Sequence, residues 1–260
     1  MKPATRAQVL QALPTWLTEK VPRDHLEPDS AFRRRRKVVT GVSLAGAGLL
    51  GVSLSTEPGS PEFYALTLGV AGTWVAGGFA SGPLHLGWMQ GKDGALQRPV
   101  LTPLALGVGA FGLFYGCALV ARRIPVLEEA IASVLSYAHQ GDPTLVAITT
   151  LANGAAEEVF FRGALYAALG TAHPVAKSTA VYALATTTTR NPALVLAAGV
   201  MGTLFAAQRR ASGGIQAPVI THLTWSTLML RYLPPLFRDP AAPPASLARV
   251  DPRFRLRRRR

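Results

Sequence analysis

Two adjacent carboxylates and one guanidinium lie in an otherwise apolar stretch of this sequence, as Glu157, Glu158 and Arg162. A charged side chain at the centre of a bilayer costs about 2.5–3.5 kcal/mol on insertion scales, so three of them within residues 144–169 require partners or a function. On a helix, Glu158 and Arg162 are four residues apart with the acid first, which favours an ion pair. Glu157 projects about 100° away and is left free for chemistry. The alternative is a helix end at the membrane surface that carries a simple salt bridge.

A second polar group lies in the apolar C-terminal part of the chain, where His222 and Ser226 stand one helical turn apart. A buried imidazole can ligate a metal, act as a general base or donate to an oxyanion, because its charge changes near neutral pH. Alone, such a histidine is more often a hydrogen-bonded packing residue. In the same bundle as an uncompensated carboxylate, His222 and Glu157 are expected to hold and deprotonate a water molecule together.

The composition indicates a multi-pass membrane protein, since 49% of the 260 residues are apolar, 25 are glycine and only 16% are charged. The net charge of +13 is concentrated at the two ends, with nine of the 27 basic residues before Val38 and seven from Arg249 onward. Such tails favour contact with anionic lipid headgroups on the cytoplasmic side of a cell membrane. Nucleic-acid binding is the weaker alternative, because no aromatic-interleaved basic surface accompanies them. The single cysteine, Cys117, excludes an intramolecular disulfide, and we expect it to be a small buried hydrophobe.

Three parts follow from this distribution: a basic cytoplasmic N-terminal segment over residues 1–37, a transmembrane bundle over 38–233, and a basic tail rich in proline and arginine over 234–260. Apolar residues recur at helical spacing over residues 6–20, which predicts either an amphipathic helix on the membrane surface or an ordinary solvent-facing helix. No continuous apolar signal-peptide core follows Lys2, so we expect the N-terminus to be retained.

Uncharged runs predict an all-α bundle of seven or eight transmembrane helices. The predicted spans are residues 38–54, 63–81, 100–120, 144–169, 174–189, 193–207 and 214–233, and residues 83–99 are expected to form a loop. Residues 126–139 are shorter than a span and contain Glu128 and Glu129, which favours a surface, tilted or re-entrant helix. Counting this segment gives eight crossings with both tails in the cytoplasm, the topology that we prefer; omitting it gives seven, with the tails on opposite sides.

The polar segments resemble the motifs of the CPBP family of intramembrane proteases, which contains type II CAAX prenyl endopeptidases and bacteriocin-processing, Abi-like proteins. The likeness rests on Glu157-Glu158-x-x-x-Arg162-Gly163 and on Gly-x-x-x-Ala-Pro-x-x-x-His-x-x-x-Ser ending at Ser226, and it spans residues 144–233. It implies that Glu157 activates water, that His222 is the histidine of the last motif, and that Glu158 and Arg162 form an accompanying structural pair. The substrate class that it implies is a membrane-associated peptide or protein.

Two positions depart from the family pattern. The middle Phe-x-x-x-His motif aligns best with Tyr182 to Thr186, so a threonine stands where the histidine is expected, and Ser226 stands where the last motif has Asn or Asp. Asn153, one turn before Glu157, and His173 are candidate replacements. The resemblance implies zinc held by Glu157 and His222, but hydroxyl groups are poor zinc ligands, so we expect less than stoichiometric zinc.

These observations leave three functions open. The first is a membrane-embedded endopeptidase in which Glu157 deprotonates a water while His222 and Ser226 stabilise the oxyanion. The second is a catalytically inactive family member that acts as a scaffold or binds a partner. The third, weaker one is a small-solute transporter, although the sequence has no paired broken-helix segments.

Overall fold

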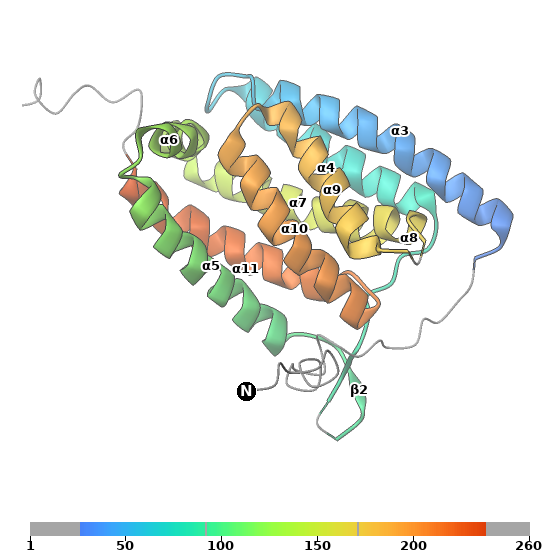
Figure 1. Cartoon of the computed structure of the whole chain (residues 1–260). Helices are drawn as coiled ribbons and strands as arrows, with labels where there is room; N and C mark the ends of the chain where they lie inside the picture. Colours follow the sequence, from blue (N-terminus) through green and yellow to red (C-terminus); the bar gives the residue numbers. More distant parts are fainter. Residues whose placement is uncertain (1–26, 92, 171, 238–260) are drawn as a thin grey trace, which may run out of the picture.

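The computed structural model describes residues 27–91, 93–170 and 172–237, and these residues are almost entirely helical (Figure 1). The helices are α3 (Asp29–Ser53), α4 (Pro61–Ser81), α5 (Leu101–Ala121), α6 (Pro125–Gln140), α7 (Pro143–Glu157), α8 (Tyr166–Ala168), α9 (Pro174–Thr186), α10 (Pro192–Ser212) and α11 (Gln216–Tyr232). A π-helical segment, Glu158–Leu165, joins α7 to α8, and single 3-10 turns occur at Thr187–Thr189 and Pro234–Leu236. The prediction of an all-α membrane bundle is confirmed.

Several helices begin with the same local device, a capping side chain followed by proline. Ser60 accepts a hydrogen bond from the amide of Phe63 (3.1 Å), and Asp142 and Asn191 each accept bonds from two amides of the helix that they precede. Such a cap stabilises a helix by about 0.5–2 kcal/mol, and proline at the first helical position lacks the amide that would otherwise be unsatisfied. The sequence therefore fixes the starts of α4, α7 and α10 locally.

Three described helices, α4, α5 and α10, are long and apolar enough to cross a membrane by length and composition. Helix α5 packs chiefly along α11 and leaves most of its surface exposed, with Leu101 and Leu113 among its exposed side chains. Cys117 lies on this exposed surface, so the expectation that it is buried was wrong. A helix with one main neighbour must present its other faces to lipid, and its uncharged sequence suits that environment.

Helix α6 lies across one end of the bundle, where Figure 1 shows it nearly along its axis while the other long helices run across the view. The Tyr137 hydroxyl on α6 donates to the carbonyls of Leu54 (2.9 Å) and Thr56 (3.0 Å), just after α3. At the start of α10, Asn191 Nδ2 donates to the Ala130 carbonyl of α6 (2.7 Å). Since α6 contacts helix ends and a connecting loop, α5 ends and α7 begins at the same end of the bundle.

The described chain consequently makes seven passes along the bundle, and its first and last described residues lie at opposite ends (Figure 1). Seven passes along the bundle correspond to the seven-crossing alternative, and the preferred eight crossings would require α6 to span the membrane as well. The reason is orientation: α6 lies across one end of the bundle and joins the end of α5 to the start of α7. The predicted surface helix at residues 6–20 and the basic tail beyond residue 237 lie outside the described residues.

The core that holds the π-helical segment in place is aromatic. Trp74 of α4 is fully buried, stacks on Phe160 at 4.7 Å between ring centroids and contacts Phe161 at 5.0 Å. Gly46 of α3 is needed opposite this ring, because a Cβ there would lie 2.3 Å from Trp74 Cη2. Helix α4 thus packs against one side of the segment that follows Glu157, and α3 packs behind the Trp74 ring.

Residues 82–91 and 93–99 lie at the end of the bundle opposite α6. They contain a hairpin of two short antiparallel strands, β1 (Met89–Gln90) and β2 (Leu96–Gln97), within the predicted loop. The amide of Trp88 donates to the Ser212 carbonyl (2.8 Å), and the amide of Ile215 donates to the His85 carbonyl (2.9 Å). These bonds fasten the connection between α10 and α11 to the loop.

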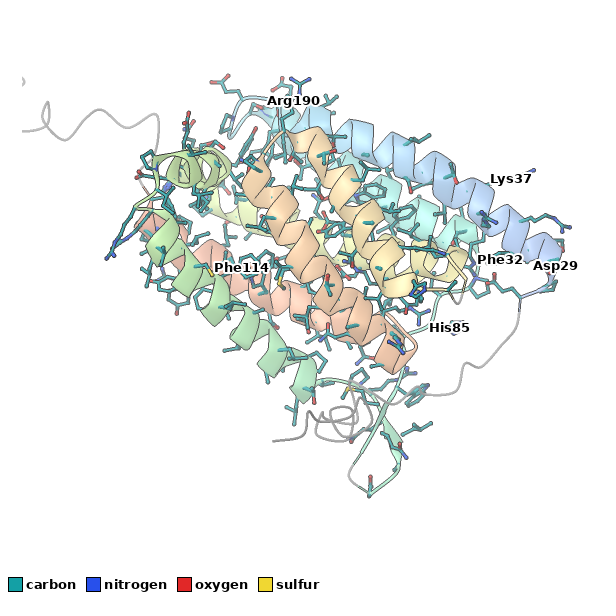
Figure 2. All side chains as sticks on the ribbon, viewed as in Figure 1. Asp29, Phe32, Lys37, His85, Phe114 and Arg190 are labelled. Atoms are coloured by element: carbon teal, nitrogen blue, oxygen red, sulfur yellow. The ribbon has the colours of Figure 1, made fainter. Side chains whose placement is uncertain are left out.

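The basic stretch Arg33 to Lys37 belongs to α3, which begins at Asp29, so the predicted boundary between residues 37 and 38 falls inside a helix. Figure 2 labels Asp29, Phe32 and Lys37 at this end of the molecule and Arg190 at the other. Arg35 is turned inward and is only 1% exposed, so at least one of the arginines expected to contact lipid headgroups has a different role.

Candidate active site

The two carboxylates of the first motif stand where the helix changes its winding. Glu157 is the last residue of α7 and Glu158 the first of the π-helical segment. A π-helical turn is rare and occurs frequently at functional sites, because it turns successive side chains away from their α-helical directions. The two neighbouring carboxylates consequently bind different partners.

Glu158 lies at the centre of a buried charge network. Its Oε1 accepts a hydrogen bond from Arg162 Nη1 (3.1 Å) and lies 2.8 Å from His222 Nδ1. Both Glu158 and Arg162 are fully buried. The predicted ion pair is therefore present, and Arg162 Nη2 also donates to the Gly202 carbonyl of α10 (3.2 Å). Arg162 thus joins the π-helical segment to α10.

His222 pairs with Glu158, where the sequence analysis paired it with Glu157. Its ring stacks on Phe205 at 4.7 Å and packs over Gly154, where a Cβ would lie 3.3 Å from the ring. Because the Glu158 oxygen that faces Nδ1 also accepts from Arg162, we assign it as the acceptor and place the imidazole proton on Nδ1. This leaves Nε2 with a lone pair, as in a catalytic histidine oriented by a carboxylate.

Glu157 has its own partner on a different helix. The hydroxyl of Tyr182, on α9, donates to Glu157 Oε2 at 2.6 Å, and the Tyr182 ring lies 4.5 Å from the Arg162 guanidinium carbon. Sequence reasoning missed Tyr182 as a site residue. The available signal was a tyrosine at the position where the middle family motif has phenylalanine, since the added hydroxyl requires a partner when buried.

Thr186, the residue aligned with the family's middle histidine, is not directed at the carboxylates. Its hydroxyl donates to the carbonyl of Tyr182 on its own helix (2.9 Å), which is a common bond for a helical threonine. Ser226, by contrast, is 6% exposed and lies one turn after His222 on α11. The structure therefore groups Glu157, Glu158, Arg162 and His222, and it gives Thr186 a backbone partner instead.

Asn153 and His173, the candidate replacements for the missing motif residues, lie in different places. Asn153 lies on α7 one turn before Glu157, and its Nδ2 donates to the carbonyls of Thr67 (3.0 Å) and Thr149 (3.2 Å). His173 is exposed and directly precedes α9. Only Asn153 is thus placed on the helix that carries the carboxylate.

A further arginine joins the site from α10. The predicted helix ended at residue 207, but α10 continues to Ser212 and buries Arg209, which is 6% exposed. Arg209 Nε donates to the Arg162 carbonyl (2.7 Å), and its guanidinium lies 5.2 Å from the Tyr166 ring. Arg209 therefore braces the π-helical segment, a role that no local pattern indicates.

Several buried polar atoms in this region have no hydrogen-bond partner among the described residues. They include Glu158 Oε2, Asn153 Oδ1 and Trp225 Nε1. The Trp225 ring lies 6.0 Å from that of His222. Buried polar atoms are normally satisfied, so this interior is suited to bind water or the polar backbone of a peptide.

The residues at the site do not fit a zinc ion. In the part of the chain that the structure describes, no three His, Cys, Asp or Glu side chains gather where they could hold a metal. His222 Nδ1 faces Glu158, and Glu157 Oε2 accepts from Tyr182. A zinc site in a protein has at least three such ligands, and hydroxyl groups do not replace them.

Residues 139–228 match the family model described as type II CAAX prenyl endopeptidase Rce1-like. The match covers about a third of the chain and contains both polar segments, from α6 to α11. No curated protein and no solved structure gives a significant match to the chain.

Proposed function

We propose that this membrane protein is an intramembrane endopeptidase of the CPBP type, which hydrolyses peptide bonds of membrane-associated substrates; the family match over residues 139–228 supports this. The observation that carries the proposal is the division of labour between adjacent carboxylates: Glu158 holds Arg162 and His222, while Glu157 is held by one neutral hydroxyl. Only Glu157 is thus placed to exchange a proton with water without breaking an ion pair.

Glu157 acts as the general base in this mechanism. It takes one proton from a water molecule, and the hydroxide oxygen attacks the carbonyl carbon of the scissile bond. The same carboxyl group then returns the proton to the amine nitrogen as the carbon–nitrogen bond breaks. Such acid–base catalysis contributes roughly 10²–10⁴-fold to a rate.

His222 orients the attacking water. With its proton on Nδ1 facing Glu158, its Nε2 accepts the second hydrogen of the water and directs an oxygen lone pair at the carbonyl. In this neutral form Nε2 has no hydrogen to donate to the oxyanion. The Ser226 hydroxyl, one turn away on the same helix, is therefore the donor that we assign to the oxyanion.

A scaffold without catalysis is the second candidate function. The observation that favours it is Thr186, whose hydroxyl bonds its own helix where the family motif places an imidazole. In that case the buried Glu158–Arg162 pair would serve to hold the fold while the exposed helix faces bind a membrane partner.

The deciding experiment is hydrolysis of fluorogenic peptides with a membrane anchor, prenylated and unprenylated, by the purified full-length protein. Glu157→Gln and Glu157→Ala should each lower kcat by about 10²–10⁴-fold, because both remove the base. Glu62→Gln is the matched control, since Glu62 is exposed at the start of α4. Wild-type protein that cleaves none of these peptides across lipids and metals would overturn the peptidase and favour the scaffold.

A further inference from the structure

The hydrogen bond between Tyr182 and Glu157 has the geometry of a strong donor on a carboxylate. At 2.6 Å it falls in the range of about 2.5–2.7 Å expected when a hydroxyl donates to an ionised oxygen. The two residues are 25 positions apart and lie on different helices, α9 and the end of α7. The bond therefore depends on tertiary structure and joins two elements that flank the site.

Packing fixes the position of the Tyr182 ring. The Phe161 ring lies 4.7 Å from it between centroids, and the Arg162 guanidinium carbon lies 4.5 Å from its centre. On the side of α10, Gly202 packs so closely that a Cβ there would lie 3.1 Å from Tyr182 Cδ1. A ring enclosed on these sides holds its hydroxyl at one place, which is what a positioning group requires.

The rest of α9 offers the carboxylate no comparable group. Thr186 lies one turn after Tyr182 and donates to the Tyr182 carbonyl, so its hydroxyl is engaged along its own helix axis. Tyr182 is therefore the α9 side chain that the structure shows bonded to Glu157. Its hydroxyl has one proton to donate at neutral pH, and that proton goes to Oε2.

We propose that Tyr182 is the positioning residue of the catalytic carboxylate, taking in this chain the place of the missing imidazole at position 186; this inference rests on the proposed peptidase function. By holding Oε2, Tyr182 fixes the carboxylate torsion and leaves Oε1 to face the water that is to be deprotonated. The carboxylate is thus oriented by a hydroxyl without any metal ligand set. Tyr182 acts through Glu157 and is not assigned a contact with the substrate.

The kinetic test is Tyr182→Phe, which removes one oxygen and keeps the ring. Losing a hydrogen bond to a charged group should lower kcat about 10–100-fold and leave KM within about twofold. In a Glu157→Gln background, adding Tyr182→Phe should cause no further loss, because the hydroxyl then has no base to position. Tyr115→Phe, on the largely exposed α5, is the control and should change neither constant. If Tyr182→Phe lowers kcat by the same factor in the wild-type and the Glu157→Gln background, the proposal is overturned and the role of Tyr182 is purely structural.

An infrared measurement separates this proposal from the proposed function. The difference spectrum between wild type and Glu157→Gln isolates the carboxylate band of Glu157, and Tyr182→Phe should shift that band because the carboxylate loses its donor. If Tyr182→Phe shifts the band but the wild-type protein cleaves no peptide, the hydrogen bond is supported while the proposed peptidase function fails. An unchanged band together with unchanged kcat would overturn the positioning role while the peptidase stands.

Discussion

Two buried arginines, Arg35 and Arg162, each pair with a glutamate, but the two centres are completed differently. Arg35 uses all three guanidinium nitrogens: it contacts Glu27 through Nε and Nη2 and donates to Ser81 Oγ (3.1 Å) and the Pro83 carbonyl (3.1 Å). Gly82 is required beside it, because a Cβ there would lie 2.7 Å from Nη2. This centre fastens the start of α3 to the end of α4.

The Arg162 centre is less complete. Arg162 Nε and Glu158 Oε2 have no hydrogen-bond partner among the described residues, and the carboxylate is shared with His222. Instead of a third polar contact, the guanidinium lies between the rings of Tyr182 and Phe205, at 4.5 and 5.1 Å. A fully satisfied centre suits a structural brace, whereas unused donors and acceptors beside a histidine suit a site that binds and transforms a ligand.

The position of the Arg35 centre at one end of the bundle leads to a prediction about which side of the membrane each terminus faces, and this is the largest effect that we expect. Among the described residues, the Arg35 end carries more basic side chains than the α6 end, which also carries Glu57, Glu62, Glu128, Glu129 and Asp142. By the positive-inside rule, we expect the start of α3 to face the cytoplasm, and seven passes place residue 237 on the other side. Reporters fused to the two termini should read opposite compartments. Matching readings would mean that α6 crosses the membrane.

The next largest effect should come from Glu158→Gln, which tests whether the Arg162 centre is functional. The amide keeps the shape but no longer fixes the imidazole proton on Nδ1, so kcat should fall by about 10²–10⁴-fold. Glu27→Gln is the matched change at the Arg35 centre and should leave kcat unchanged. Size-exclusion profiles of both variants in detergent check that the fold is kept. Similar kinetic losses in the two variants would remove the distinction between the centres.

A smaller, thermodynamic difference should separate the two arginines. Arg162→Ala removes the guanidinium from the buried Glu158 carboxylate, leaves it only the His222 imidazole, and should cost about 3–5 kcal/mol of stability. Arg35→Ala should cost about 1–3 kcal/mol, because Glu27 is 17% exposed and can be hydrated. Glu157→Ala, which breaks only a bond to a neutral hydroxyl, should cost less than Arg162→Ala. Thermal unfolding in one detergent measures all three, and an Arg162→Ala protein as stable as wild type would contradict the burial of the pair.

The sequence predicts the elements of this fold well because local signals mark them. Uncharged runs of membrane length, prolines after capping residues and the i,i+4 spacing of Glu158 and Arg162 depend on neighbouring residues only. Each of these features is present in the structure. What the sequence could not give is how the elements face each other.

The assignment of partners across helices is where sequence reasoning was incomplete. Glu157 and Glu158 are adjacent, so no spacing rule states which of them meets His222, and the π-helical winding decides it. The inward turn of Arg35 depends on the phase of α3, which a run of four arginines does not reveal. Tyr182 and Arg209 reach the site only through the packing of α9 and α10.

The smallest expected effect concerns metal at the Arg162 centre. Purified protein should contain much less than stoichiometric zinc, because His222 Nδ1 and Glu157 Oε2 are already engaged and the two positions that depart from the family motifs, Thr186 and Ser226, offer only hydroxyls. Thr186→His adds an imidazole on α9 and should raise the zinc content measured by elemental analysis, since an imidazole is a far better ligand than an alcohol. Thr187→His, on the exposed neighbouring position, is the control and should add no zinc. A stoichiometric zinc signal in wild type that disappears with Glu157→Ala or His222→Ala would mean that these side chains rearrange to bind metal, and the distinction between a metal-free catalytic centre and a structural brace would have to be redrawn.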